Sequence, residues 1–215
     1  MALQLYLHPL SSYCQKAKTA FYEKDIPFET RMLDGSEPVA SEFAALWPIG
    51  RFPILMDGER MIFETTIIIE YLDAHYPGAI QLIPHDPYLA IEARMMDRFF
   101  DNYLQGPQQR IVDIVLGRDR AEEAPMRAKL DTAYGALDRL LEGRTWAAGE
   151  EFTLADCSAA PALLYADWTH AIPKTYANVW AYRDRVLARP SYARALDEAR
   201  PYRYMFPLGA PVGRD

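Results

Sequence analysis

Apolar and polar residues alternate at the start of the chain and then change to a helical spacing. Residues 3–8 (LQLYLH) alternate, which predicts a short strand that ends in a turn. Apolar residues then recur at i, i+3 and i+4, which predicts a helix over residues 12–24 with one core-facing stripe. A proline breaks this helix, and the extended stretch PFETRML at residues 27–33 predicts a second strand.

The pattern RFPILMDGERMIF predicts a hairpin, because Asp57-Gly58 separates two apolar runs. Residues 64–76 (ETTIIIEYLDAHY) then carry apolar residues at helical spacing, and Pro77-Gly78 ends that helix. With the mixed segment over residues 35–46 counted as a short helix, the first eighty residues read strand, helix, strand, helix, strand, strand, helix. This order predicts an α/β unit.

Strand signals disappear after a proline-containing stretch, QLIPHDP, at residues 81–87. Turn and helix-breaking residues then separate five predicted helices. Their expected ranges are 88–116, 124–142, 154–168, 176–188 and 191–199. We therefore expect an α+β protein with an N-terminal α/β domain over residues 1–80, a linker over 81–87 and an all-helical domain over 88–215.

Composition and charge narrow the classes of function. Half of the residues are hydrophobic and 13% are aromatic, which excludes an intrinsically disordered chain. A formal net charge of −7 argues against nucleic acid or an anionic membrane as the partner. No stretch predicts a signal peptide or a membrane-spanning helix, and Cys14 and Cys157 have no metal-ligand spacing. We expect a cytoplasmic protein without a metal.

The first candidate for chemistry is the serine pair Ser11-Ser12, where the first strand meets the first helix. Free backbone N–H groups and the helix dipole favour negative charge at such a place. A hydroxyl that donates to a bound thiolate would lower the thiol pKa by roughly one to two units. The alternative is that either serine only caps the helix. Cys14, one helical turn on, is expected to be a small buried residue.

Three further segments extend this picture: Gly50-Arg51-Phe52-Pro53-Ile54-Leu55, Phe63-Glu64-Thr65 and Phe152-Thr153-Leu154-Ala155-Asp156. Together with the strand and the Ser-Ser-Tyr-Cys turn, they resemble the glutathione transferase family over nearly the whole chain. The resemblance implies a thioredoxin-like domain that binds glutathione, followed by a helical domain that forms the pocket for a second substrate. Thr153 and Asp156 have the spacing of a helix capping box and are expected to support the fold.

The resemblance also implies a catalytic role for the serine pair. The hydroxyl of Ser11 would donate to the glutathione thiolate, and Ser12 is the alternative. Phe52 would precede a cis Pro53, so that the backbone of Phe52 pairs with the cysteinyl unit of glutathione like an added strand.

The two ends of glutathione are assigned to other residues. Glu64 would accept from the ammonium of the γ-glutamyl group, and Thr65 would bind its carboxylate at a helix N-terminus. Plain capping is the alternative for both residues. Arg51 would meet the glycyl carboxylate, or would be a solvated surface arginine.

These assignments predict an enzyme that activates the thiol of glutathione, its substrate, for attack on a small hydrophobic electrophile. Tyr103 and Trp168 are expected in the electrophile pocket, because both combine an apolar ring with a polar group. Another glutathione-dependent enzyme of the same fold (an isomerase, a dehalogenase or an ether-cleaving lyase) and a noncatalytic interaction module are the alternatives.

A homodimer is also expected, mostly from the resemblance. The helices around residues 64–76 and 88–116 carry more apolar residues than one buried face requires, and association would cover them. The residues in question are Ile62, Phe63, Met95, Met96, Phe99 and Phe100.

Overall fold

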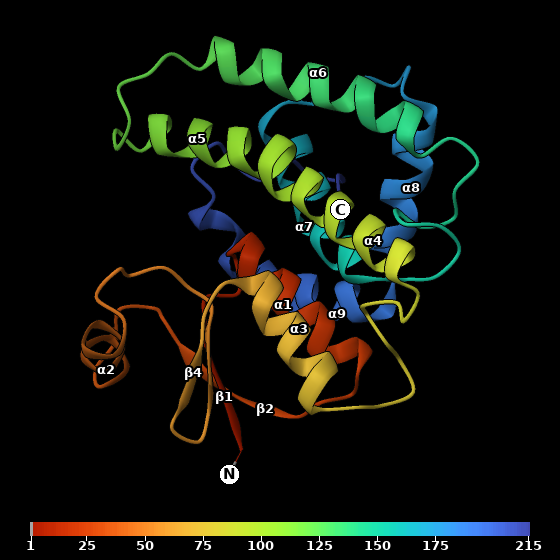
Figure 1. The fold of residues 1–215 in the computed structure, drawn as a ribbon. Coiled ribbons are helices and arrows are strands. Elements are labelled where there is room, and N and C mark those ends of the chain that lie inside the picture. The colour runs from red at the N-terminus through yellow and green to blue at the C-terminus, as the bar shows by residue number, and fades with distance from the viewer. Residues whose placement is uncertain (1) are drawn as a thin grey trace.

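A four-stranded mixed sheet forms the first part of the protein. The computed structural model describes residues 2–215. The strands lie in the order β2-β1-β3-β4 (Figure 1). Their bounds are β1 (Leu3–Leu7), β2 (Phe28–Met32), β3 (Ile54–Asp57) and β4 (Arg60–Ile62).

Strand β1 is central and has one parallel and one antiparallel neighbour. Its Leu5 lies opposite Thr30 of β2 in parallel register and opposite Leu55 of β3 in antiparallel register. The parallel pair needs a crossover, which α1 (Ser12–Glu23) supplies. Strands β3 and β4 form the predicted hairpin, and Gly58 takes the positive φ of 60° that its turn requires.

Three helices accompany the sheet. Helices α1 and α3 (Thr65–His75) lie between the sheet and the later helices, whereas the short α2 (Val39–Leu46) lies to one side (Figure 1). Residues of β1, α1 and α3 share one apolar core, in which Leu5, Phe21 and Ile68 are fully buried. The predicted order of elements up to residue 76 is therefore confirmed.

Helices make up the rest of the chain. They are α4 (Pro87–Phe99), the π-helical segment η1 (Phe100–Gln105), α5 (Gly106–Val115), α6 (Ala124–Leu140), α7 (Leu154–Thr169), α8 (Ala177–Leu187), α9 (Pro190–Ala199) and the 3-10 segment η2 (Arg200–Met205). Each predicted helix is present with bounds within two residues, but the one predicted over 88–116 contains η1. No helix among residues 2–215 has the length and apolar character needed to cross a membrane.

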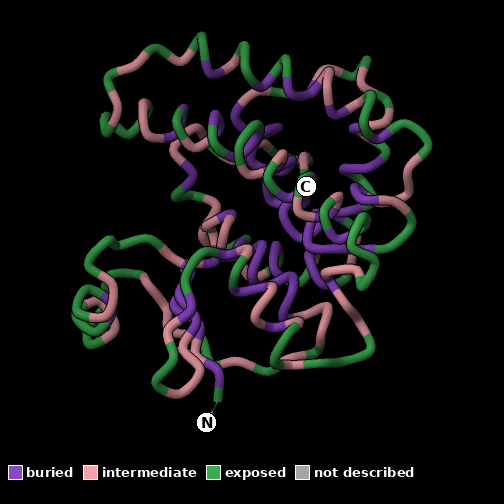
Figure 2. Tube along the Cα trace, in the orientation of Figure 1, coloured by how far each residue is buried: buried purple, intermediate pink, exposed green. Residues whose placement is uncertain are grey.

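Helix α7 is the centre of the helical part, and all of its residues are buried (Figure 2). It begins with the predicted capping box, in which Thr153 accepts from the backbone of the first turn and Asp156 accepts from the Thr153 N–H over 2.8 Å. Asp156 also accepts from Ala147 N and from the Tyr182 hydroxyl. The motif therefore fixes the surrounding loop and α8 as well as the helix start.

Helices α1 and α7 pack directly against each other, and both cysteines lie in the core they share. Cys14 and Cys157 are fully buried free thiols. Burial raises the pKa of Cys14 to about 11, which agrees with the expectation of a small buried residue. The expected linker over residues 81–87 lies between α3 and α4.

Candidate active site

One cavity of about 1200 Å³ collects every residue that the sequence analysis assigned to glutathione. The residues come from three separate stretches: the start of α1, the segment before β3 and the start of α3. They are Ser11, Ser12, Arg51, Phe52, Pro53, Glu64 and Thr65. The sheet brings these stretches together, because β1 and β3 are paired and α1 and α3 cover the same face.

Ser11 is the N-cap of α1. Its hydroxyl oxygen accepts from the Cys14 N–H over 3.4 Å, and its own N–H donates to the His8 carbonyl over 3.0 Å. A serine hydroxyl that accepts one hydrogen bond still has its proton to donate. Capping and donation to a ligand are therefore compatible at Ser11. Ser12 is the first residue of α1 and is 8% exposed.

The Phe52-Pro53 peptide bond is cis, as the resemblance implied. Strand β3 begins directly afterwards at Ile54, which lies opposite Tyr6 of β1. No backbone hydrogen bond within residues 2–215 uses the N–H or C=O of Phe52. The backbone N–H and C=O of Phe52, at the cavity wall, are thus suited to pair with a peptide ligand.

Glu64 and Thr65 stand at the N-terminus of α3. Glu64 occupies the N-cap position with φ 67° and ψ 116°, and its side chain makes no capping hydrogen bond. A non-glycine residue in such a conformation costs about 1–3 kcal/mol and is typical of functional sites. Plain side-chain capping, the alternative for Glu64, is therefore not what the structure shows. Thr65 is buried beside it, and Arg51 is exposed at the cavity edge.

Two residues that the sequence analysis did not select also line this cavity. His8 follows β1, and its Nδ1 accepts from the Leu10 N–H over 3.2 Å. Burial lowers the pKa of His8, which favours the neutral ring. Because Nδ1 is the acceptor, the proton of the neutral ring lies on Nε2. Burial and then the nearby Asp101 raise the pKa of Tyr13 to about 12. The sequence did contain a signal for His8, because it directly follows a predicted strand and ligands often bind at the carboxyl ends of strands.

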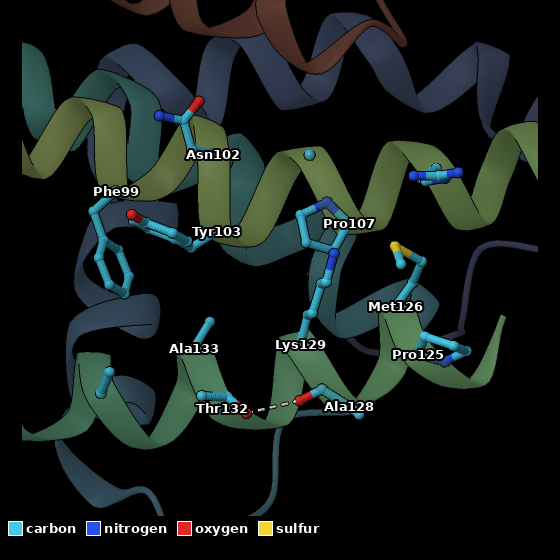
Figure 3. A pocket seen from close by; sticks show the side chains of 13 residues that line it. Phe99, Asn102, Tyr103, Pro107, Pro125, Met126, Ala128, Lys129, Thr132 and Ala133 are labelled. Carbon is cyan, nitrogen blue, oxygen red and sulfur yellow. Dashed lines mark hydrogen bonds between the residues drawn. The ribbon is translucent and has the colours of Figure 1, made fainter.

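Tyr103 and Trp168, expected in the electrophile pocket, are not among the residues that line this cavity. Tyr103 lies on η1 and borders a second cavity of about 800 Å³, where η1 and α5 face α6 (Figure 3). Trp168 is buried against Phe206, and its Nε1 donates to the Arg214 carbonyl over 3.4 Å. Tyr103 and Trp168 were selected because each combines an apolar ring with a polar group. Neither that property nor helical spacing tells which neighbouring element the side chain faces. The wider turn of η1 further changes the direction of the residues that follow Phe99.

Other residues form the part of the cavity beyond the positions that the resemblance assigned to glutathione. Helix α7 contributes Tyr165, whose hydroxyl donates to the Leu10 carbonyl over 2.7 Å, and Phe206 follows η2. The segment η1 and helix α5 contribute Gln105 and Gln108. The cavity thus joins a polar, peptide-sized region at the sheet to a mixed region at the helices. Among residues 2–215, no three His, Cys, Asp or Glu side chains are grouped to hold a metal ion.

Comparisons with known proteins agree with this geometry. Residues 5–79 match the family model described as glutathione S-transferase, N-terminal domain, and residues 94–190 match glutathione S-transferase, C-terminal domain. A stringent starvation protein A homolog from Coxiella burnetii is 25% identical over 205 residues, which are 92% of each chain. Glutathione S-transferase theta-1 from Bos taurus is 30% identical over 179 residues, which are 77% of this chain and 73% of the bovine protein.

A solved structure shows the same architecture. The delta-class glutathione transferase of Nilaparvata lugens superimposes with a TM-score of 0.83 and 25% identity, over 95% of this chain and 98% of that chain. The thioredoxin-like sheet, the helical second part and both family models therefore lead to one assignment: the chain belongs to the glutathione S-transferase family.

Proposed function

We propose that the protein is a glutathione transferase that binds glutathione in the 1200 Å³ cavity and activates its thiol as a thiolate. The observation that carries this proposal is the convergence of Ser11, Phe52 and Glu64, from three separate segments, on that one cavity. Their chemistry matches the three polar parts of the tripeptide: a thiol, a peptide unit and an amino acid end.

Glutathione is held along its length in this proposal. The carboxylate of Glu64 accepts from the γ-glutamyl ammonium, and the hydroxyl and N–H of Thr65 bind the neighbouring carboxylate at the N-terminus of α3. The free N–H and C=O of Phe52 pair with the cysteinyl unit. Arg51 meets the glycyl carboxylate at the cavity edge.

Ser11 acts on the thiol. Its hydroxyl proton is available because its oxygen already serves as the acceptor for Cys14 N–H. The Ser11 hydroxyl keeps its proton and donates a hydrogen bond to sulfur, which stabilises the thiolate, and the thiol proton leaves to solvent. The thiolate then attacks the electrophilic carbon, the C–S bond forms, and the electrons of the broken bond leave with the departing group or take a proton from solvent. Ser12 is the alternative donor.

A second candidate function is a noncatalytic interaction module of the same fold. The observation in its favour is the relative named stringent starvation protein A homolog, which matches over 92% of this chain. Sister glutathione chemistries, such as isomerisation, dehalogenation or ether cleavage, would use the same thiolate. Each of these candidates, like the transferase, would act in the cytoplasm.

Two measurements in sequence separate these functions. Calorimetric titration with glutathione tests the site, and the purified protein is then assayed with halogenated dinitrobenzenes, enals, epoxides, isothiocyanates and aryl ethers. Binding followed by conjugation supports the transferase, whereas binding without turnover of any of these compounds supports the module or a narrower sister chemistry. Absence of glutathione binding would reject the proposal outright.

A further inference from the structure

Two glutamines border the candidate active site and are almost completely buried. Gln105, the last residue of η1, is 3% exposed, and Gln108 of α5 is 2% exposed. Nε2 of Gln105 donates to Oε1 of Gln108 over 2.7 Å, and Nε2 of Gln108 donates to the Thr169 hydroxyl over 3.3 Å. One chain of hydrogen bonds therefore fixes both amides against α7.

This series of hydrogen bonds leaves one polar atom of Gln105 without a partner. Within residues 2–215, Oε1 of Gln105 is buried and has no hydrogen-bond partner. If both amides are turned by 180°, every donor and acceptor in the series changes places. Nε2 of Gln105 is then the atom without a partner. Either way, Gln105 keeps one hydrogen-bonding atom unused, although nearly all buried polar groups in proteins have a partner.

The cavity lining that follows Gln105 along α5 is polar. The same wall of the cavity continues along α5 with Gln109, Arg110 and Asp113, and Arg110 is paired with Asp119 over 2.8 Å. Gln105 also ends a π-helical segment, a local geometry that is frequent at functional sites. A ligand lying in this part of the cavity thus meets amides and charges as well as the rings of α7 and η2.

We propose that Gln105 is a specificity-determining residue that binds a hydroxyl group on the second substrate. This inference rests on the proposed glutathione transferase function, and it changes the expected substrate from a purely hydrophobic electrophile to one that carries an apolar part and a hydroxyl. A hydroxyl donates and accepts, so it fits either orientation of the Gln105 amide. Gln108 acts as a positioning residue, because it holds Gln105 without contacting the ligand in this arrangement.

S-substituted glutathiones test the inference without a choice of electrophile. We would titrate the protein calorimetrically with S-alkyl glutathiones of increasing chain length, each beside the counterpart with a terminal hydroxyl. At one chain length the hydroxylated compound is expected to bind about tenfold tighter, because a buried partner for Gln105 is gained. Gln105→Leu and Gln105→Met are expected to reduce this ratio of affinities to near one. Two variants are used so that a folding defect in one of them does not decide the test.

Gln4→Leu is the matched control, since it removes an amide of the same size that lies outside the cavity and bonds to Glu29 over 3.1 Å. It is expected to keep the preference for the hydroxylated compound. Equal binding of both compounds at every chain length would overturn the inference while the glutathione site stands. A preference for the hydroxylated compound that survives in folded Gln105 variants would overturn it as well. Failure of all the compounds and of glutathione itself to bind would reject the proposed function instead.

Discussion

The ammonium of Lys16 lies 2.6 Å from Oδ1 of Asp97, and both side chains are buried. Asp101 Oδ2 lies 2.8 Å from the same ammonium, and Thr66 donates to Asp97 Oδ2 over 2.9 Å. Lys16 belongs to α1, the helix that begins beside Ser11, and Thr66 follows Thr65, the first residue of α3. This ion cluster therefore ties both helices of the proposed glutathione site to α4 and η1.

Removing the lysine charge should destabilise the fold. We expect Lys16→Met to lower the free energy of unfolding by about 3–5 kcal/mol, since it removes the cation from the buried Oδ1 of Asp97. Arg98 still pairs with Oδ2 of Asp97 and with Asp101 in that variant. Urea denaturation measures the change. Lys129→Met, at an exposed lysine of α6, should stay within about 0.5 kcal/mol of the original protein. If the two variants are equally stable, solvent reaches the cluster and the pair contributes little.

Ser11→Ala should slow conjugation more than it weakens glutathione binding, because the hydroxyl bonds most strongly to the thiolate. The pKa of bound glutathione thiol is expected to rise by roughly one to two units, measured by the ultraviolet absorbance of the thiolate. Ser12→Ala is the matched control at the neighbouring position. A shift in the Ser12 variant but not in the Ser11 variant would transfer the role to Ser12.

Substitution of Glu64 should affect binding and stability in opposite directions. Glu64→Gly is expected to weaken glutathione binding by about 1.5–3 kcal/mol through loss of a charge-assisted hydrogen bond. The same variant should raise the melting temperature of the ligand-free protein, since glycine adopts the observed φ of 67° without strain. Glu64→Ala loses the carboxylate and keeps the strain, so it should bind equally weakly without the gain in melting temperature. Calorimetry and thermal unfolding of both variants test this pair of effects.

The surface of α3 and α4 bears on the predicted homodimer. Phe63, Ile67, Ile91 and Met95 are between 44% and 64% exposed. The ion pair of Arg94 and Glu70, 2.7 Å apart, joins these two helices. Of the apolar residues that the sequence analysis assigned to association, Ile62, Met96 and Phe100 are instead buried within the chain.

We expect light scattering to give a mass near twice 24.6 kDa, because association would cover this apolar surface. Met95→Asp should then shift the mass toward the monomer, whereas Val212→Asp, at a fully exposed position, should not. A monomer at micromolar concentration in the unmodified protein would contradict the prediction.

The two cysteines should be unreactive in the folded protein. Neither Cys14 nor Cys157 should react with an aromatic disulfide reagent at pH 8, and both should react in denaturant, since burial raises both pKa values, that of Cys14 to about 11. Between the usual thiol pKa of 9.0 and about 11, the folded state keeps a proton at Cys14 that the unfolded state releases. The free energy of unfolding should therefore fall as the pH rises through this interval. Rapid labelling of either thiol in the native protein would contradict the assignment.

The sequence predicted most of the elements, because their signals are local. Alternation marked β1, Asp57-Gly58 marked the hairpin, and the Thr153-Asp156 spacing marked the start of α7. It also pointed to Ser11, since a hydroxyl at a strand-to-helix junction is visible in one short segment. Periodicity did not reveal η1, whose π-helical turn keeps the same apolar residues as an ordinary helix.

By itself, the sequence determined the order of strands and helices, the buried cysteines and the residue types suited to a thiol and a tripeptide. Only the tertiary structure decided which side chains meet: it brought Phe52 and Glu64 to the cavity of Ser11, turned Tyr103 toward α6, and buried Gln105 with one amide atom unused. The physical reason is that helix and strand periods depend on neighbours in the chain. The composition of a cavity wall depends instead on how distant elements pack, and no local pattern records that packing.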